Sequence, residues 1–241
     1  MIDLNCDMGE SYGRFQIGND EALFPYITSC NIACGFHGGD PLHIERTIEK
    51  ALAHDLRIGA HPSYPDLMGF GRRKMQLSRD ELSALIKYQV AALIGMVESM
   101  GGQLSYVKPH GALYNSMVQD AAEAETVVLA IKAISPELAV MGLAGSQVKA
   151  ITKAAGMTFI AEAFADRRYD NNGHLVARGK PGAVIGDAHA AAEQVWEMVN
   201  QQQLTSIEGK KLSLKADSFC IHGDNPAAVA ILKAIHAKFS A

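Results

Sequence analysis

Apolar residues along the chain follow two different spacings. Short runs of apolar and β-branched residues end at Gly, Pro or Asp, which is typical of buried strands. Longer segments place apolar residues three or four positions apart, which is the spacing of one face of a helix. The short runs are predicted to form seven strands, at residues 2–6, 29–34, 57–60, 105–108, 138–142, 158–162 and 218–221.

The longer segments carry the residues with which helices begin and end. Asp40 and Pro41 supply an N-cap followed by a proline in the first turn. Ser78 to Glu81 is a capping box, and Gly101 ends the helix that it opens. Asn225 is also followed by a proline, so we expect it to cap a helix as Asp40 does. The other predicted helices begin at Asp120, Ser146 and Asp187.

Strands that alternate with helices along the whole chain predict parallel βαβ units. Because the crossovers of such units are right-handed, the sheet curls toward a closed barrel. We therefore expect an α/β fold in which residues 1–241 form a single TIM-like barrel of seven parallel strands, with an open doubly wound sheet as the alternative. The polar segment at residues 168–181 is predicted to form an extended loop or a small hairpin after the sixth strand.

The composition is that of a soluble globular protein. Of the 241 residues, 48% are hydrophobic and 20% are charged, and the net charge of −4 offers no basic surface for nucleic acid or anionic lipid. We expect neither a signal peptide nor a membrane span, because no apolar run approaches the ~18 residues that cross a bilayer. The four cysteines fit neither a disulfide framework nor a zinc finger, so we expect reduced thiols and a cytoplasmic location.

Polar side chains follow the predicted strands at their carboxyl ends. In a parallel barrel these ends and the loops after them form one face, so the side chains are expected to surround one cavity. Histidine follows four different strands, at positions 37, 61, 110 and 222. The other residues predicted at this face are Asn5, Asp7, Glu10, Asn31, Asp40, Asp66, Lys108, Tyr114, Asn115, Glu162, Asp166, Arg167, Asp224 and Asn225. Singly, each is as typical of a turn or a cap as of a catalytic site.

Two common signatures are missing from the sequence. It contains neither the G-x-x-x-x-G-K-[ST] loop of many nucleotide-binding proteins nor the G-x-S-x-G elbow of serine hydrolases. The segment "GFGRR", which begins at Gly69, lacks the third glycine of a dinucleotide fingerprint and follows no strand. It is predicted to be a basic loop that binds anions, with a plain surface turn as the alternative.

Seven sequence blocks together resemble the LamB/YcsF family. They are "DLNCDMGE", "NIACGFHGGD", "IGAHPSYPD", "GFGRR", "VKPHGALYN", "FADRRY" and "IHGD", in collinear order from residue 2 to about residue 225. The resemblance implies a seven-stranded β/α barrel similar to that of polysaccharide deacetylases. It also implies cleavage of 5-oxo-L-proline to L-glutamate with ATP hydrolysis, in company with two further subunits, B and C.

The implied reaction must activate a resonance-stabilised amide. The implied route is phosphorylation of the amide oxygen by ATP, after which water attacks the ring carbon. Because this chain has no Walker loop, we expect subunits B and C to supply most of the ATP site and this barrel to open the ring. Lys108 and Arg167 are expected to bind the substrate carboxylate or the phosphoryl group, since an ammonium and a guanidinium both bind such anions.

Candidates for the general base and the general acid are Asp7, His61, His110 and His222, with Asp7 as the first choice for the base. Asp166 and Asp224 are expected to orient neighbouring imidazoles, and Asp166 also to share in proton transfer. The residues predicted to bind the substrate are Asn5, Glu10, Lys108, Tyr114, Glu162, Arg167 and Asp224.

Two other functions remain open. Asp7, His37 and His61 are similar to the carboxylate and paired imidazoles that hold a catalytic divalent cation in deacetylase-like barrels. The protein would then be an amidase or deacetylase that acts alone and without ATP. A third interpretation is a non-catalytic protein that holds 5-oxoproline for its partners.

Overall fold

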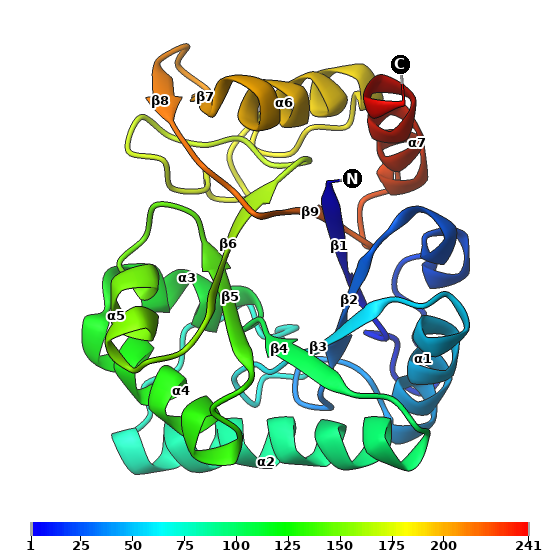
Figure 1. Cartoon of the computed structure of the whole chain (residues 1–241), viewed down its shortest axis with the longest axis vertical. Helices are drawn as coiled ribbons and strands as arrows, with labels where there is room; N and C mark the ends of the chain where they lie inside the picture. Colours follow the sequence, from blue (N-terminus) through cyan, green and yellow to red (C-terminus); the bar gives the residue numbers. More distant parts are fainter. Residues whose placement is uncertain (1, 241) are drawn as a thin grey trace.

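Seven parallel strands form a closed barrel at the centre of the computed structural model, which describes residues 2–240 (Figure 1). Around the barrel the order is β1-β2-β3-β4-β5-β6-β9, and β9 closes it between β6 and β1. The bounds are β1 (Asp3–Met8), β2 (Ser29–Ala33), β3 (Arg57–His61), β4 (Leu104–Val107), β5 (Ala139–Leu143), β6 (Phe159–Phe164) and β9 (Ser218–His222). The predicted seven-stranded barrel is confirmed, and each predicted strand lies within two residues of an observed one.

Barrel strands are buried on both faces, which explains why they read as nearly continuous apolar runs. In β1, Leu4, Cys6 and Met8 belong to the hydrophobic core. Asn5 and Asp7 alternate with them and point into the barrel, because successive residues of a strand face opposite sides. The strand pattern therefore sends polar side chains to the interior at alternate positions.

Within residues 2–240, seven α-helices surround the barrel (Figure 1). They are α1 (Pro41–Ala53), α2 (Arg79–Ser99), α3 (Gly111–Gln119), α4 (Ala121–Ile134), α5 (Val148–Ala154), α6 (Ala188–Gln201) and α7 (Ala228–Phe239). The short helices η1 (Asp20–Ala22) and η2 (Phe24–Tyr26) precede β2, and the hairpin of β7 (Gln203–Thr205) and β8 (Lys211–Ser213) follows α6. Residues 168–181 form the expected loop, with an isolated antiparallel bridge between Tyr169 and Leu175.

Cap chemistry decides where most helices begin. The Asp40 carboxylate accepts hydrogen bonds from the first turn of α1, and Ser78 and Glu81 form the predicted capping box of α2. Asp120 and Asp187 cap α4 and α6 in the same way. These starts are local in the chain, which is why the sequence predicts them.

Two helix starts differ from the sequence-based expectation. The prediction that Asn225 caps α7 is wrong, because its side chain accepts from the backbone of Ala227 in a turn before the helix, which begins at Ala228. The sequence rules also do not predict α3. Its N-cap residue, His110, makes no capping hydrogen bond with its side chain, so "PHG" reads as a turn.

Among residues 2–240, only α2 has the length and apolar character of a membrane span, with a mean hydropathy of 1.2 over 18 residues. Its buried side chains include Leu82, Ile86 and Val90, on a helix that contacts β3, β4 and α4. The packing of α2 on the barrel and on α4 therefore accounts for these apolar residues.

The four cysteines are free thiols, as expected. Burial raises the pKa of Cys6, Cys30 and Cys220 well above the usual value of a thiol. Burial also raises the pKa of Cys34 to about 12. Because the thiolate is the reactive form, none of the four is a ready nucleophile at neutral pH.

Gly59 in β3 leaves room for the ring of Tyr106, which a Cβ atom at this position would overlap. We expect Gly59→Ala to destabilise the fold by about 1–3 kcal/mol, the usual effect of overpacking a core. Gly95 in α2 has no atom within 4 Å of the corresponding position. Gly95→Ala is the matched control and should stabilise the protein by about 0.5–1 kcal/mol. Urea unfolding measures both shifts, and equal stability of the two variants would contradict this packing.

Candidate active site

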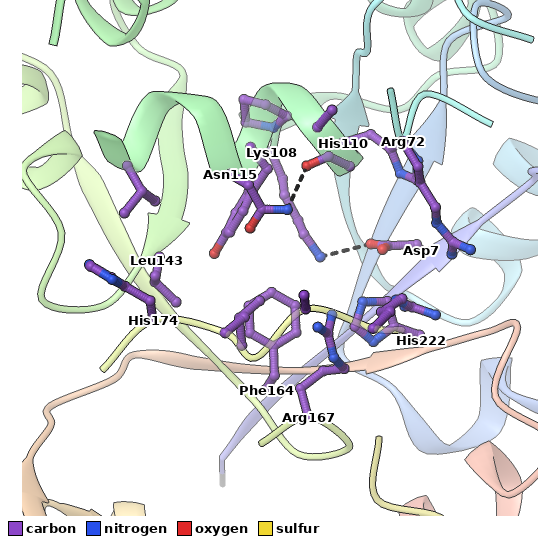
Figure 2. A pocket seen from close by; sticks show the side chains of 18 of the residues that line it. Asp7, Arg72, Lys108, His110, Asn115, Leu143, Phe164, Arg167, His174 and His222 are labelled. Atoms are coloured by element: carbon purple, nitrogen blue, oxygen red, sulfur yellow. Dashed lines mark hydrogen bonds and ion pairs between the residues drawn. The ribbon is translucent and has the colours of Figure 1, made fainter. Parts of the chain in front are cut away.

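The carboxyl ends of the barrel strands open into a cavity of about 400 Å³, a size that suits a small molecule. Its walls come from the ends of β1, β3 and β9 and from the segments after β4 and β6. The polar residues that line it are Asp7, His61, Arg72, Lys108, His110, Tyr114, Asn115, Gln119, Arg167, His174, Arg178 and His222 (Figure 2). Side chains far apart in the sequence thus share one space.

Lys108 is the central charge on the cavity floor. Its Nζ atom lies 2.8 Å from Asp7 Oδ1 and 2.8 Å from Glu162 Oε1, and Figure 2 shows it pointing toward Asp7. Burial would lower the pKa of Lys108, but the charge of Asp7 holds it well above its usual value. Burial would raise the pKa of Asp7, but the charges of His61 and Lys108 hold it well below its usual value. Lys108 is therefore an ammonium and Asp7 a carboxylate.

A buried network beneath Lys108 fixes Asp7. Asn31 Nδ2 donates to Asp7 Oδ1 at 2.8 Å and to Asn5 Oδ1 at 2.7 Å. Tyr106 donates its hydroxyl hydrogen to Asn31 Oδ1 at 2.6 Å, and Lys108 Nζ donates to Asn5 Oδ1 at 3.3 Å. Asn5 lies under the cavity floor and does not line the cavity. Its amide therefore supports the charged groups above it.

His222 and Asp166 form an oriented pair at the cavity wall. His222 Nδ1 lies 2.8 Å from Asp166 Oδ1, and since a carboxylate only accepts, Nδ1 carries the hydrogen. Asp166 Oδ2 also accepts from the backbone of His222 and from Asn225 Nδ2. Burial would raise the pKa of Asp166, but His222 holds it below its usual value. Nε2 of His222 is left to accept a proton, as a general base must.

His61 and His110 present facing nitrogens, His61 Nε2 and His110 Nδ1, which are 2.9 Å apart. The other nitrogen of each ring donates to a carbonyl, His61 Nδ1 to Lys108 at 2.7 Å and His110 Nε2 to Phe70 at 2.8 Å. In neutral rings both facing nitrogens would therefore carry lone pairs, which repel at this distance. This repulsion is relieved when one of the two facing nitrogens carries a hydrogen or when both bind a metal ion. Asp7 Oδ2 lies 3.4 Å from His61 Nε2.

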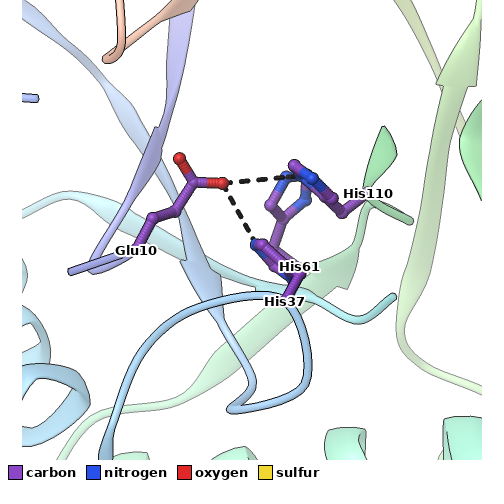
Figure 3. A group of neighbouring side chains, drawn as sticks. All are labelled: Glu10, His37, His61 and His110. Carbon is purple, nitrogen blue, oxygen red and sulfur yellow. Dashed lines mark hydrogen bonds and ion pairs between the residues drawn. The ribbon is translucent and has the colours of Figure 1, made fainter. Parts of the chain in front are cut away.

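Glu10 and His37 do not line the cavity, and Figure 3 shows them close to this pair of histidines. Glu10 Oε1 is 3.1 Å from His37 Nε2 and 3.5 Å from His110 Nδ1. Burial raises the pKa of Glu10 to about 8, and it lowers the pKa of His37 and of His110 well below the usual value. With His61, these residues form a buried group of four whose ligand atoms lie within 4.8 Å of one another.

This group has the donor atoms of a transition-metal site. Imidazole and carboxylate bind zinc and similar ions, and the outer N–H groups of His61 and His110 are bonded to carbonyls as those of metal ligands are. His37 stacks on His110, with ring centroids 3.8 Å apart and planes at 4°. A metal ion lies in the plane of each imidazole ring that binds it. Because the rings of His37 and His110 are parallel and stacked, one ion cannot lie in both planes. Glu10, His61 and His110 therefore fit one ion best. Asp7, predicted as a ligand with His37 and His61, lies outside this group of four, with Oδ1 2.8 Å from Lys108 Nζ and Oδ2 3.4 Å from His61 Nε2.

Arginines gather at the mouth of the cavity. Arg72 Nη2 lies 2.6 Å from Asp224 Oδ2, and Arg178 Nη1 lies 3.2 Å from the same oxygen. The sequence predicts that Asp224 orients an imidazole or binds the substrate, but two guanidinium groups hold it. Arg167, three residues after β6, donates from Nη2 to the carbonyl of Val176 at 2.6 Å.

Over residues 2–241 the sequence matches the LamB/YcsF family. The chain belongs to this family. Proteins named as the A component of 5-oxoprolinase from Acinetobacter baumannii and Geobacillus thermodenitrificans are 48% and 47% identical to it, over 98% of this chain and 93% and 92% of their own lengths. The crystal structure of a lactam utilization protein from Thermus thermophilus is 40% identical, with a TM-score of 0.92 over 99% of this chain and 97% of that one.

The predicted site residues of this LamB/YcsF chain fall into two layers. Those that line the cavity are Asp7, His61, Lys108, His110, Tyr114, Arg167 and His222. Those that lie behind them are Asn5, Glu10, His37, Glu162, Asp166 and Asp224. Burial and the charge of Glu162 raise the pKa of Tyr114 well above its usual value, so it faces the cavity as a neutral phenol. The second layer holds the first through the contacts described above.

Among the polar residues of the lining, sequence reasoning missed Gln119, His174 and Arg178. His174 and Arg178 lie in the loop at residues 168–181, which follows β6 at the active end of the barrel. A long loop with basic residues after a barrel strand is a signal that could have found them. Arg72 belongs to the "GFGRR" segment, for which anion binding is predicted from the sequence.

Proposed function

We propose that this chain acts as the A component of an ATP-dependent 5-oxoprolinase and opens the lactam ring of 5-oxo-L-proline to give L-glutamate. Its identity of 48% over nearly the whole length of a protein named as that component supports this function. The size of the cavity also suits a small anionic lactam. The observation that carries the proposal is the Asp166–His222 pair at the wall of a cavity whose floor holds a buried ammonium.

The chemistry requires a base, an acid and fixed positive charge. Phosphorylation of the amide oxygen by ATP makes the ring carbon electrophilic. Water then adds to this carbon and loses a proton to the base, and the C–N bond breaks as the ring nitrogen takes a proton from the acid. The product of this step is an acyl phosphate, which a second water converts to the carboxylate and inorganic phosphate.

His222 is the base in this proposal, because Asp166 holds its Nδ1–H and leaves Nε2 free. Asp7, the first choice from the sequence, is a poor base because His61 and Lys108 hold its pKa well below the usual value. We assign Asp7 the role of counterion to Lys108. His61, whose Nε2 lies 2.9 Å from His110 Nδ1, is the acid toward the ring nitrogen in this proposal. Lys108 stabilises negative charge on the substrate.

ATP and the partner proteins complete the proposal. Because the chain lacks a Walker loop, two further subunits, B and C, supply most of the ATP site. The relatives are named as one component of 5-oxoprolinase, and this supports a complex of several chains. We place this complex in the cytoplasm, where thiols such as these four remain reduced.

Reconstitution tests this function. With partner subunits B and C, the chain should form glutamate from 5-oxo-L-proline with one ADP released per glutamate, and the chain alone should form none. Coupled assays for glutamate and for ADP measure both products on the same samples. Glutamate formation by the chain alone and without ATP would contradict the proposal.

The buried group around Glu10 makes a metal-dependent amidase the second candidate function, because its carboxylate and imidazoles have the chemistry of a divalent-cation site. A bound ion would supply a hydroxide at neutral pH. Elemental analysis of the purified chain, followed by a chelator in the assay without partners, separates the two functions. Amidase activity that is lost with the chelator and restored by zinc would favour this candidate.

A further inference from the structure

Positive charge is in excess at the mouth of the cavity. Arg72, Arg167 and Arg178 line it and come from the loop after β3, the segment just after β6 and the loop at residues 168–181. Among residues 2–240, Asp224 is the carboxylate that forms ion pairs with Arg72 and Arg178. The charge of Asp166 also acts on Arg167, but no carboxylate forms an ion pair with it within the described part of the chain.

Arg167 is the unusual member of this set, because its side chain is buried without a carboxylate partner. It is 6% exposed, and its Nε atom has no hydrogen-bond partner within the described part of the chain. Burial, together with the nearby charge of Arg178, lowers the pKa of Arg167 to about 10, which leaves it protonated at neutral pH. A buried guanidinium with an unpaired donor is costly unless an anion completes its bonds.

Arg72 and Arg178 share a single carboxylate, so neither is neutralised in full. Arg72 Nη2 lies 2.6 Å from Asp224 Oδ2, and Arg178 Nη1 lies 3.4 Å and 3.2 Å from the two oxygens of Asp224. Arg72 also lies over the ring of Phe70, with Cζ 4.8 Å from its centroid. Asp224 and Phe70 thus hold the two guanidinium groups at the mouth and leave donors for a ligand.

We propose that Arg72, Arg167 and Arg178 form a phosphoryl-binding site at the mouth of the cavity. The proposal rests on the proposed function, in which the activated lactam carries a phosphoryl group. A phosphoryl group has three terminal oxygens and nearly two negative charges, which suit three guanidinium groups of which two share one carboxylate and the third has no ion-pair partner. A carboxylate has two oxygens and one charge, which a single guanidinium fork satisfies. Phosphate held here would leave the ring facing His222 and Lys108.

The binding of inorganic phosphate to the isolated chain tests this site, and calorimetry gives the affinity. Arg178→Gln and Arg167→Gln should each weaken phosphate binding at least 10-fold. Arg178 is half-exposed, so its variant keeps the test valid if loss of the buried Arg167 prevents folding. Arg73→Gln is the matched control, because Arg73 pairs with Asp66 and does not line the cavity. It should leave phosphate binding unchanged.

Acetate distinguishes a phosphoryl site from a carboxylate site. Acetate should bind at least 10-fold more weakly than phosphate, and Arg178→Gln should narrow that difference. Equal binding of the two anions, or phosphate binding that Arg178→Gln and Arg167→Gln leave unchanged, would overturn the proposal. In the reconstituted complex, Arg178→Gln should lower kcat with little change in the KM for 5-oxoproline. Failure of the function itself would be distinct, because the wild-type complex would form no glutamate while phosphate still bound.

Discussion

Replacement of His222 by Gln is expected to lower the turnover of the reconstituted complex by about 10²–10⁴-fold, the usual contribution of a general base. A glutamine side chain is polar and similar in size to histidine, so the wall of the cavity should keep its shape. It cannot take a proton from water at neutral pH. Stopped assays of glutamate formation at saturating ATP and 5-oxoproline measure the loss.

His174→Gln is the matched control for this substitution. His174 also lines the cavity, but its nearest carboxylate, Asp170, is 3.9 Å away and the imidazole is half-exposed. Without an orienting partner it should contribute little, and the rate should stay within a few-fold of the wild type. Equal losses for His174→Gln and His222→Gln would show that orientation by Asp166 does not select the base.

Asp166→Asn should lower the turnover of the reconstituted complex about as much as His222→Gln does, although the imidazole of His222 is still present. Asp166 Oδ2 accepts from Asn225 Nδ2 at 3.1 Å and from the backbone of His222 at 3.3 Å, so the amide oxygen of an asparagine would stay there. Its NH₂ group would then face His222 Nδ1 and donate to it. The imidazole would carry its hydrogen on Nε2, where it cannot accept a proton.

The sequence predicts those parts of the fold that depend on neighbouring residues. The capping box at Ser78 and the caps at Asp40 and Asp120 each involve residues two or three positions apart, and all three are present. The barrel follows from strands that read as apolar runs. Because the strands are parallel, the polar side chains that follow them meet at one end of the barrel.

Specific pairings are beyond the reach of the sequence, because they depend on which strands face each other. Asp166 and His222 are 56 positions apart, and Asp7 and Lys108 are 101 apart. The choice of Asp7 as the base shows the consequence. A carboxylate at the end of a strand is a reasonable candidate for a general base. In the structure, however, an ammonium lies 2.8 Å from Asp7 and helps to hold its pKa well below the usual value.

Helix α3 shows a second limit of sequence reasoning. Its first turn forms where the backbone after His110 meets the loop of "GFGRR", since Ala112 donates its N–H to the carbonyl of Gly71 at 2.9 Å. His110 itself is held by the carbonyl of Phe70 in the same loop. Tertiary contacts thus replace a capping residue, and the sequence near residue 111 contains no pattern that predicts them.

Lys108→Met is expected to destabilise the folded chain by about 3–5 kcal/mol, because removal of one partner leaves buried charge without compensation. Asp7 and Glu162 each lie 2.8 Å from the ammonium, so its loss leaves two buried carboxylates facing each other. Methionine fills a similar volume, which limits the effect of a cavity. Urea unfolding at neutral pH measures the change, and the complex should lose its activity.

A second substitution separates charge from packing. Glu162→Gln in the Lys108→Met background removes one of the two stranded charges, so it should recover a large part of the lost stability while activity stays absent. Lowering the pH should stabilise Lys108→Met relative to the wild type, because protonation of Asp7 removes its repulsion with Glu162. The wild type behaves in the opposite way. His61 and Lys108 hold the pKa of Asp7 below its value in the unfolded chain, so the ionised carboxylate stabilises the folded state. This stabilisation is lost as the pH falls and Asp7 is protonated. If Lys108→Met had wild-type stability at both neutral and acidic pH, the ammonium would not hold the cavity floor together.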